Sequence, residues 1–240
     1  EMSTQGKNMK ECIVAFIDIL GSTAAIKSDA EKSLEMMHDA YTESMDLFDY
    51  LFEDKSVRPS VKIFSDNIIA AMPRMGESGH GAFCAVVMMS AIIQVQFLKR
   101  GLLTRGGIAS GNFFADEVMV WGMALVKAYD LESNVAIYPR VVVDPELIKE
   151  LGLTKENCEF RSKEWIVQDE DSLFVVDYIN KYLENRDFFA IRMLDVIEQK
   201  IVQHSGNIKI CQKWLWLMNY IKVKINSFSE KKKTYDWRTS

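Results

Sequence analysis

The chain has 240 residues, 48% hydrophobic and 26% charged, which is the composition of an ordinary soluble globular protein. Its formal net charge of −5 argues against a general nucleic-acid-binding protein, which would normally carry a basic face. The four cysteines form no CxxC pair and the three histidines lie far apart, so neither a disulfide framework nor a zinc site is expected. We therefore expect a cytoplasmic protein that does not bind nucleic acid.

The N-terminal third predicts a strand, a long helix and a hairpin. Residues 12–20 (CIVAFIDIL) are rich in β-branched and aromatic residues and predict a buried strand. Residues 23–53 carry apolar side chains at helical spacing. Residues 60–64 and 68–72 are two apolar runs around a short polar segment, which predicts a hairpin with Asp66 at its tip.

The next segment, residues 82–98, contains no charged residue and is followed by Lys99 and Arg100. Its length is at the lower limit for a membrane-spanning helix, and Ser90, Gln94 and Gln96 fall within it. A core helix packed on a sheet explains this pattern better, so no membrane span is expected.

The remaining chain predicts further strands and helices. Strands are expected at 102–114, 118–121 and 138–144, helices at 122–134 and 145–152, a hairpin from 160–167 and 172–178, and helical structure over 181–228. Hairpins mixed with crossover helices indicate an α+β sandwich with a largely antiparallel sheet. Residues 1–11 and 229–240 are expected to be flexible, and 181–228 should form a helical extension packed on the core.

The segment FIDILGST at residues 16–23 has a direct chemical use. Asp18 stands near the end of a hydrophobic strand, where its carboxylate can hold a hard cation. The Gly-Ser-Thr that follows opens a helix, and backbone N–H groups at a helix start bind phosphate oxygens. The alternative is that Asp18 only caps that helix.

Asp66 is the second candidate residue. Alone, it is equally explained by turn chemistry, since Ser, Asp and Asn are favoured turn residues. A strand ending near Asp18 beside a hairpin carrying Asp66 would bring both carboxylates to one sheet edge. Two close carboxylates repel unless they are protonated or bridged by cations, and oxygen ligands favour Mg²⁺ or Mn²⁺ over Zn²⁺.

The pattern F-x-D-I-x-G-S-T, the later hairpin aspartate and R-x-G-I-x-x-G at residues 105–111 resemble the class III adenylate and guanylate cyclase homology domain. The resemblance covers residues 12–180, the expected catalytic domain. It implies a ferredoxin-like βαββαβ core, two divalent cations (Mn²⁺ or Mg²⁺) and active sites at the interface of a homodimer. Asp18 and Asp66 would be the catalytic metal ligands, with the Ile19 carbonyl as a further ligand. The phosphate-binding residues would be Leu20, Gly21, Ser22 and Thr23.

The chain departs from this family at positions that decide base choice and catalysis. Lys62 matches a base-contacting lysine, but Met119 stands where the family usually has Asp or Cys. Val126 and Asp130 stand where it has a transition-state Asn and Arg. Three basic residues are candidates for the missing cation, and the sequence does not choose among Arg105, Lys127 and Arg140.

These departures, with the stretches GMALVKAYDLE, YPRVVVD and KWLWLMNY, resemble the pyrimidine cyclases of bacterial Pycsar antiphage systems. That resemblance implies conversion of UTP or CTP to cyclic UMP or cyclic CMP and pyrophosphate, a signal that activates a separate effector protein. Met119 offers a purine neither donor nor acceptor, which fits this interpretation. A purine cyclase, favoured by Lys62, and a catalytically degenerate nucleotide-binding domain, favoured by the missing Asn and Arg, are the alternatives.

Overall fold

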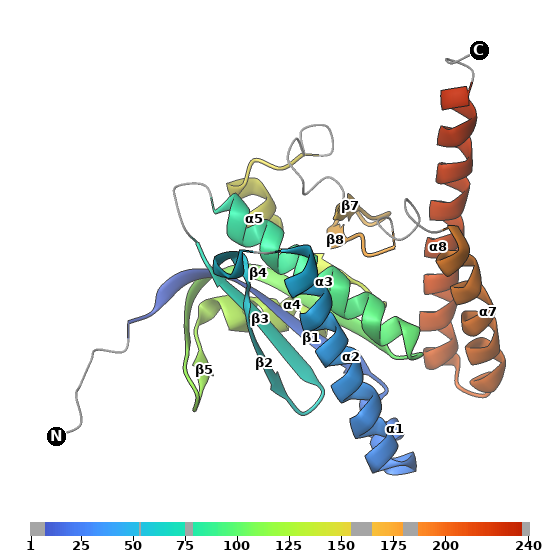
Figure 1. Cartoon of the computed structure of the whole chain (residues 1–240), viewed down its shortest axis with the longest axis horizontal. Helices are drawn as coiled ribbons and strands as arrows, with labels where there is room; N and C mark the ends of the chain where they lie inside the picture. The colour runs from blue at the N-terminus through green and yellow to red at the C-terminus, as the bar shows by residue number, and fades with distance from the viewer. Residues whose placement is uncertain (1–7, 53, 75–78, 155–164, 180–186, 237–240) are drawn as a thin grey trace.

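The computed structural model describes residues 8–52, 54–74, 79–154, 165–179 and 187–236 (Figure 1). Its strands are β1 (Lys10–Leu20), β2 (Ser60–Phe64), β3 (Asn67–Pro73), β4 (Leu103–Ala115), β5 (Val120–Trp121), β6 (Val141–Val143), β7 (Ile166–Gln168) and β8 (Phe174–Val176). Its helices are α1 (Ser22–Ser28), α2 (Ala30–Leu51), α3 (His80–Lys99), α4 (Met123–Asn134), α5 (Pro145–Glu150), α7 (Asp187–Gln203) and α8 (Ile208–Asp236), with a 3₁₀ turn at Lys55–Val57.

The strands form one sheet in the order β2-β3-β1-β4-β6-β8-β7, with β5 paired to β4. Only the β4–β6 pair is parallel among the described strands. The first four strands and the helices between them follow the βαββαβ order, with β1 at the centre between β3 and β4. The predicted α+β class, with a largely antiparallel sheet and a C-terminal helical part, is confirmed.

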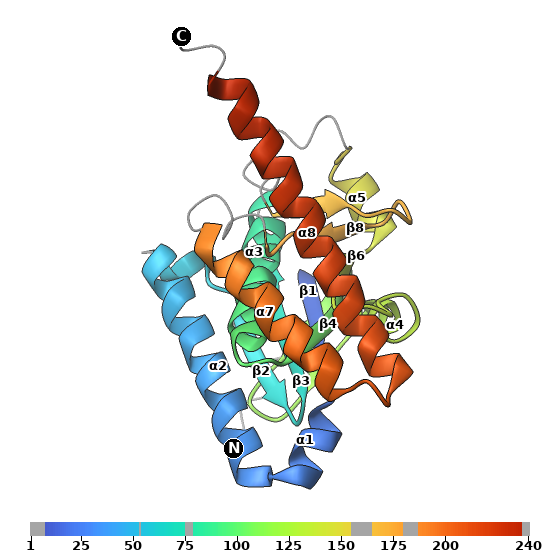
Figure 2. The same ribbon diagram turned by 90° about the vertical axis from the view of Figure 1, so that its right-hand side faces the viewer.

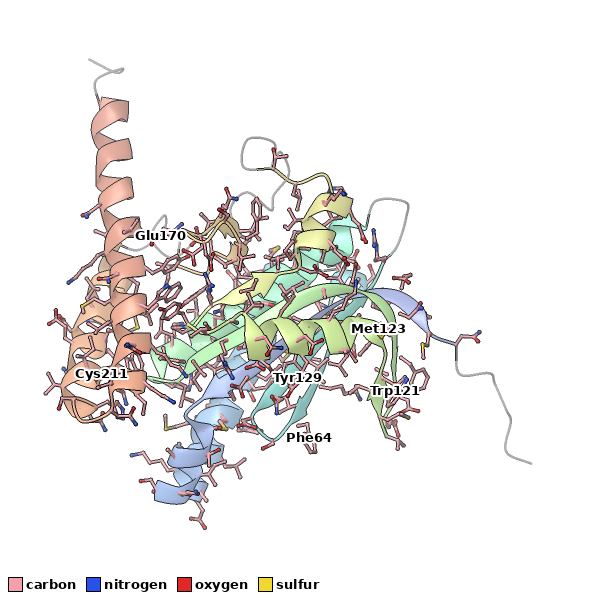
Figure 3. All side chains as sticks on the ribbon, turned by 180° about the vertical axis from the view of Figure 1, so that it is seen from behind. Phe64, Trp121, Met123, Tyr129, Glu170 and Cys211 are labelled. Carbon is pink, nitrogen blue, oxygen red and sulfur yellow. The ribbon has the colours of Figure 1, made fainter. Side chains whose placement is uncertain are left out.

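The two faces of the sheet are covered differently. Helices α2 and α3 pack on one face and enclose the main core, to which β1 contributes Ile13, Ala15 and Ile17. The other face carries the alternate β1 residues, including Val14 and Phe16, and is covered in part by α4 (Figure 3). We call this second side the open face; β1 positions of the same parity as Val14, including Asp18, lie on it.

Helix α3 is the apolar segment that raised the question of a membrane span. It is long and apolar enough to cross a membrane, but 83% of its most apolar window is buried inside the fold. Ser90 donates to the Val86 carbonyl at 2.7 Å, which satisfies a hydroxyl buried in this helix. The helix is therefore the central helix of the main core.

Several element boundaries differ from the predicted ones, and three of these differences have a clear local cause. The helix expected over 23–53 is two helices, because Asp29 adopts an extended conformation and its carboxylate accepts a hydrogen bond from the Lys32 amide, capping α2. The strand expected over 138–144 is only Val141–Val143, because the Arg140 amide donates to the Tyr138 carbonyl in a tight turn.

The third difference concerns the C-terminal helical part. The 181–228 segment is interrupted between α7 and α8, where the Asn207 side chain accepts from the Ile210 amide and caps α8. Helix α8 then continues to Asp236, through part of the segment expected to be flexible. The Glu and Lys residues of this stretch are good helix formers, which explains the continuation. The expected strand residues 160–164 lie outside the described residues.

Candidate active site at the end of strand β1

Asp18 lies near the end of β1, with a neighbour in register on each side. It pairs with Asn67 of β3 and with Arg105 of β4. Phe64 of β2 pairs in turn with Asn67, so these four residues form a row across the open face. Asp66 occupies the β2–β3 turn, and its carbonyl accepts a hydrogen bond from the Ile19 amide at 3.0 Å. The sheet register thus brings the two predicted carboxylates to the same edge.

Ser22, at the start of α1, connects the phosphate-binding segment to Asp66. Its buried hydroxyl donates a hydrogen bond to the Asp66 carboxylate, and this bond is the main reason that the pKa of Asp66 lies below its usual value. Gly21 precedes the helix with φ 84, a left-handed conformation in which glycine has no steric cost. Leu20 is partly buried and Thr23 is exposed. The Gly-Ser-Thr segment therefore orients Asp66 and opens α1 beside it.

The two carboxylates differ in their electrostatic environment. Burial raises the pKa of Asp18, opposed by its hydrogen bond and ion pair with Arg105 and increased by the charge of Asp66. The Arg105 Nε atom lies 3.3 Å from Asp18 Oδ2. A half-buried carboxylate next to a second carboxylate has an unfavourable charge that a bound cation would relieve.

Glu132 is the residue of this cluster that the sequence did not suggest. It is 3% exposed on α4, and its Oε1 atom lies 2.6 Å from Arg105 Nη2. The orientation is poor, because Oε1 makes no hydrogen bond, whereas Oε2 accepts one from Ser133 at 2.7 Å. Burial raises the pKa of Glu132. The available signal was its helical spacing from Ala124 and Ala128, which places a carboxylate on the buried face of α4.

The other two candidate cations lie in ion pairs away from Asp18. Lys127 Nζ lies 2.9 Å from Glu146 Oε2 at the surface. Arg140 is 5% exposed and is held by Asp169 and Asp171, the acidic residues of the β7–β8 turn. Of the three candidates, Arg105 is the one that contacts a predicted metal ligand.

The two predicted base-binding residues lie in different places. Lys62 pairs with Ile69 in β2–β3, on the open face and one step along the hairpin from the row that contains Asp18. Met119 lies in the β4–β5 turn, where its side chain lines an apolar cavity of about 250 Å³ with Met9, Phe114 and Trp121. Arg105 of β4 pairs with Asp18, whereas Ala115 at the other end of β4 leads into this turn. Nine residues lie between them, which corresponds to about 30 Å along the strand. The structure therefore does not bring Met119 to Asp18 of the same chain.

The donor set fits a hard divalent cation shared with a ligand. Among the described residues no group of three or more His, Cys, Asp and Glu side chains forms a closed metal site. Two carboxylates at one sheet edge, with the Ile19 carbonyl beside them, leave most coordination positions to other oxygens. Mg²⁺ and Mn²⁺ bind in this way, through one or two carboxylates plus substrate phosphates.

No protein-family model matches the chain, and a comparison with curated proteins gives no significant match. Among solved structures, the adenylyl cyclase CyaB of P. aeruginosa is 19% identical to this chain, with a TM-score of 0.48. The matched region spans 70% of this chain and 94% of the CyaB chain. The guanylyl cyclase domain of the RhoGC fusion protein of Blastocladiella emersonii is 15% identical, with TM-score 0.46 and coverages of 70% and 95%. A class III adenylyl cyclase-like ATP-binding protein from Pseudomonas aeruginosa is 11% identical, with TM-score 0.48 and coverages of 72% and 39%.

Proposed function

We propose that this protein is a homodimeric nucleotide cyclase that uses Asp18 and Asp66 as metal ligands. The observation that carries the proposal is that Asp18 and Asp66 lie at one sheet edge, next to the Gly-Ser-Thr segment that opens α1. Two close carboxylates are costly to keep ionised without a cation, and the arrangement leaves coordination positions for triphosphate oxygens.

Each residue of this edge has a role in the proposed reaction. When bound, two divalent cations would lower the pKa of the ribose 3′-hydroxyl and neutralise charge on the phosphates. Asp18, Asp66 and the Ile19 carbonyl hold the cations, and the Ser22 hydroxyl keeps the Asp66 carboxylate ionised and oriented. Backbone N–H groups of residues 20–23 bind phosphate oxygens. In-line attack of the 3′-oxygen on the α-phosphate closes the ring and expels pyrophosphate.

The homodimer is supported by an exposed apolar surface on the open face. Phe64 at the tip of the β2–β3 hairpin is 79% exposed, and Trp121 of β5 is 61% exposed. Met123 and Tyr129 of α4 are exposed on the same side of the molecule (Figure 3). Exposed apolar patches of this kind are typical of interfaces. A homodimer would also explain why Met119 lies far from Asp18 of its own chain. The β4–β5 turn of one chain would then approach the sheet edge that carries Asp18 and Asp66 in the other chain.

For the substrate we propose a pyrimidine triphosphate, UTP or CTP, with cyclic UMP or cyclic CMP as a messenger in antiphage defence that acts on a separate effector. Met119 supports this choice, because an apolar side chain in a small cavity offers no donor or acceptor to a purine. Lys62 would donate to a carbonyl oxygen of the base.

A second candidate function is nucleotide binding without turnover. It is favoured by the ion pairs that engage all three candidate cations, Arg105, Lys127 and Arg140, in the described part of the chain. Incubating the pure protein with Mn²⁺ and each of ATP, GTP, CTP and UTP, followed by mass spectrometry of the products, tests both candidates. A cyclic pyrimidine nucleotide supports the proposal, a cyclic purine nucleotide leaves a cyclase with the other base choice, and no product favours binding alone.

A further inference from the structure

Arg105 is shared between two carboxylates that come from different elements. Its Nε atom donates a hydrogen bond to Asp18 Oδ2 on β1 at 3.3 Å, and its Nη2 atom lies 2.6 Å from Glu132 Oε1 on α4. A guanidinium group is planar and has donors on several edges, so it can contact two carboxylates at once. Strand β4 thus places one cation between β1 and α4, and these three elements lie next to one another in Figure 2.

The position of Glu132 is fixed by the packing of α4 on β4. A Cβ atom at Gly107, two residues after Arg105, would lie 2.3 Å from the Ala128 carbonyl oxygen, so the helix touches the strand at this point. Glu132 follows Ala128 by one helical turn and is 3% exposed, and its Oε2 atom accepts a hydrogen bond from the Ser133 hydroxyl at 2.7 Å. The carboxylate is therefore held beside Arg105 and is shielded from water.

The two contacts of Arg105 differ in length and in burial. The contact with Asp18 is the longer one, and the Asp18 side chain is 20% exposed, against 4% for that of Glu132. Water weakens an ion pair that it can reach, whereas a buried carboxylate that loses its cation carries a large cost. Arg105 therefore leaves Asp18 more easily than it leaves Glu132.

Glu132 can also form a better bond with Arg105 than the present one. Its Oε1 atom makes no hydrogen bond, although Arg105 Nη2 lies 2.6 Å away. A rotation of the guanidinium toward α4 would give this buried oxygen a donor, at the expense of the 3.3 Å bond to Asp18. A divalent cation at Asp18 would favour the same rotation, because it would repel the guanidinium from that carboxylate.

We propose that Glu132 is a positioning residue of the candidate active site: it holds Arg105 when a divalent cation replaces the guanidinium at Asp18. The inference rests on the proposed function, because it assumes that Asp18 is a metal ligand. It adds that binding of the cation is an exchange of ion pairs, in which Asp18 changes its partner and Glu132 keeps Arg105. Helix α4 then acts on the metal site through Arg105.

This exchange makes the effect of Glu132 on the cation depend on Arg105. In Glu132→Gln the guanidinium keeps only its bond to Asp18, so the cation must displace it without a second carboxylate to receive it. We expect binding of a free cation to weaken by on the order of tenfold, which is typical of coupled members of one charged network. In Arg105→Met there is no guanidinium to displace, so the cation binds more tightly and Glu132→Gln has little further effect.

The test is the binding of Mn²⁺ alone, without nucleotide, measured from the electron paramagnetic resonance signal of free Mn²⁺. It compares wild type, Glu132→Gln, Arg105→Met and the double variant. Glu35→Gln is the matched control, because Glu35 is exposed on α2, which covers the opposite face of the sheet, and its loss changes the net charge equally. Asp18→Asn identifies the Mn²⁺ that binds at the candidate site. Circular dichroism establishes that each variant is folded.

We expect Glu132→Gln to bind Mn²⁺ about tenfold more weakly than wild type, Glu35→Gln to stay within about twofold of wild type, and the double variant to match Arg105→Met within about twofold. Unchanged binding in Glu132→Gln, or an equal loss on the Arg105→Met background, overturns the inference while the metal site stands. A loss in Glu35→Gln as large as that in Glu132→Gln does the same. Mn²⁺ binding that Asp18→Asn does not weaken overturns both the metal site and the inference.

If Arg105→Met does not fold, because it leaves Glu132 without a cation, the double variant decides the question. The double variant lacks both charges of the buried pair. Mn²⁺ binding tighter than that of wild type supports the inference, because the competing guanidinium is gone. Binding no tighter than that of wild type overturns it.

Discussion

Replacing Gly107 with alanine should destabilise the protein by separating α4 from the sheet. A Cβ atom at this β4 position would lie 2.3 Å from the Ala128 carbonyl oxygen and 2.5 Å from Leu131 Cβ, both on α4. Neither group is the end of a flexible side chain, so the helix must shift. Overpacking of this kind costs about 1–3 kcal/mol, and we expect the upper end because a backbone atom is involved. For a chain of this size, that corresponds to a fall in Tm of about 6–12 °C.

The assay is thermal unfolding followed by circular dichroism, with urea unfolding as a second measure of stability. Gly81→Ala is the matched control, because Gly81 lies in α3 and no heavy atom lies within 4 Å of its added Cβ. The same substitution should stabilise a helix there by up to about 1 kcal/mol. A Gly107→Ala protein that melts at or above the wild-type temperature would refute the close approach of α4 to β4.

Four further predictions concern the candidate site. Asp18→Asn and Asp66→Asn should each abolish cyclic-nucleotide formation, and wild-type turnover by either variant would remove that residue from the metal site. Without metal, the Tm of Asp18→Asn should equal or exceed that of wild type. The difference in Tm should grow as the pH rises through the raised pKa of Asp18, because the half-buried carboxylate of the wild type is then charged. A lower Tm of the variant at neutral pH would contradict this prediction. Mixing Asp66→Ala and Lys62→Ala proteins should restore activity that neither has alone, since one site of a heterodimer keeps both functions; a mixture that exchanges subunits without recovery would exclude a shared interface site. Met119→Ala should increase kcat/KM for ATP or GTP relative to that for UTP or CTP, by a factor that corresponds to on the order of 1–3 kcal/mol of transition-state binding. Unchanged ratios of kcat/KM would exclude Met119 from the base pocket.

The parts of the fold that follow from local patterns were predictable. The apolar runs around Asp66 and before Asp18 specify β-strands through their own composition, and the sheet register then places the two carboxylates together. The break between α1 and α2 also has a local signal, because Asp29 is followed by Ala-Glu-Lys, but the apolar spacing continues across it and suggests one helix. Gly206 is the corresponding local signal for the interruption before α8.

The electrostatic environment of the site depends on contacts between segments that are distant in the sequence. It therefore cannot be predicted from local sequence patterns. Arg105 meets Glu132 because β4 and α4 pack together. Nothing in the residues around Arg140 shows that Asp169 and Asp171 enclose it. Side-chain partners across different elements therefore had to come from the structure.

The apolar helix α3 also has a consequence for synthesis of the protein. It emerges from the ribosome before β4, the strand that completes the centre of the sheet, has emerged. During that interval this apolar helix can be covered only by the elements that precede it, chiefly β1, β3 and α2. Chaperones that bind exposed apolar segments are therefore expected to hold the nascent chain at this stage, and slower translation after α3 should lower the soluble yield.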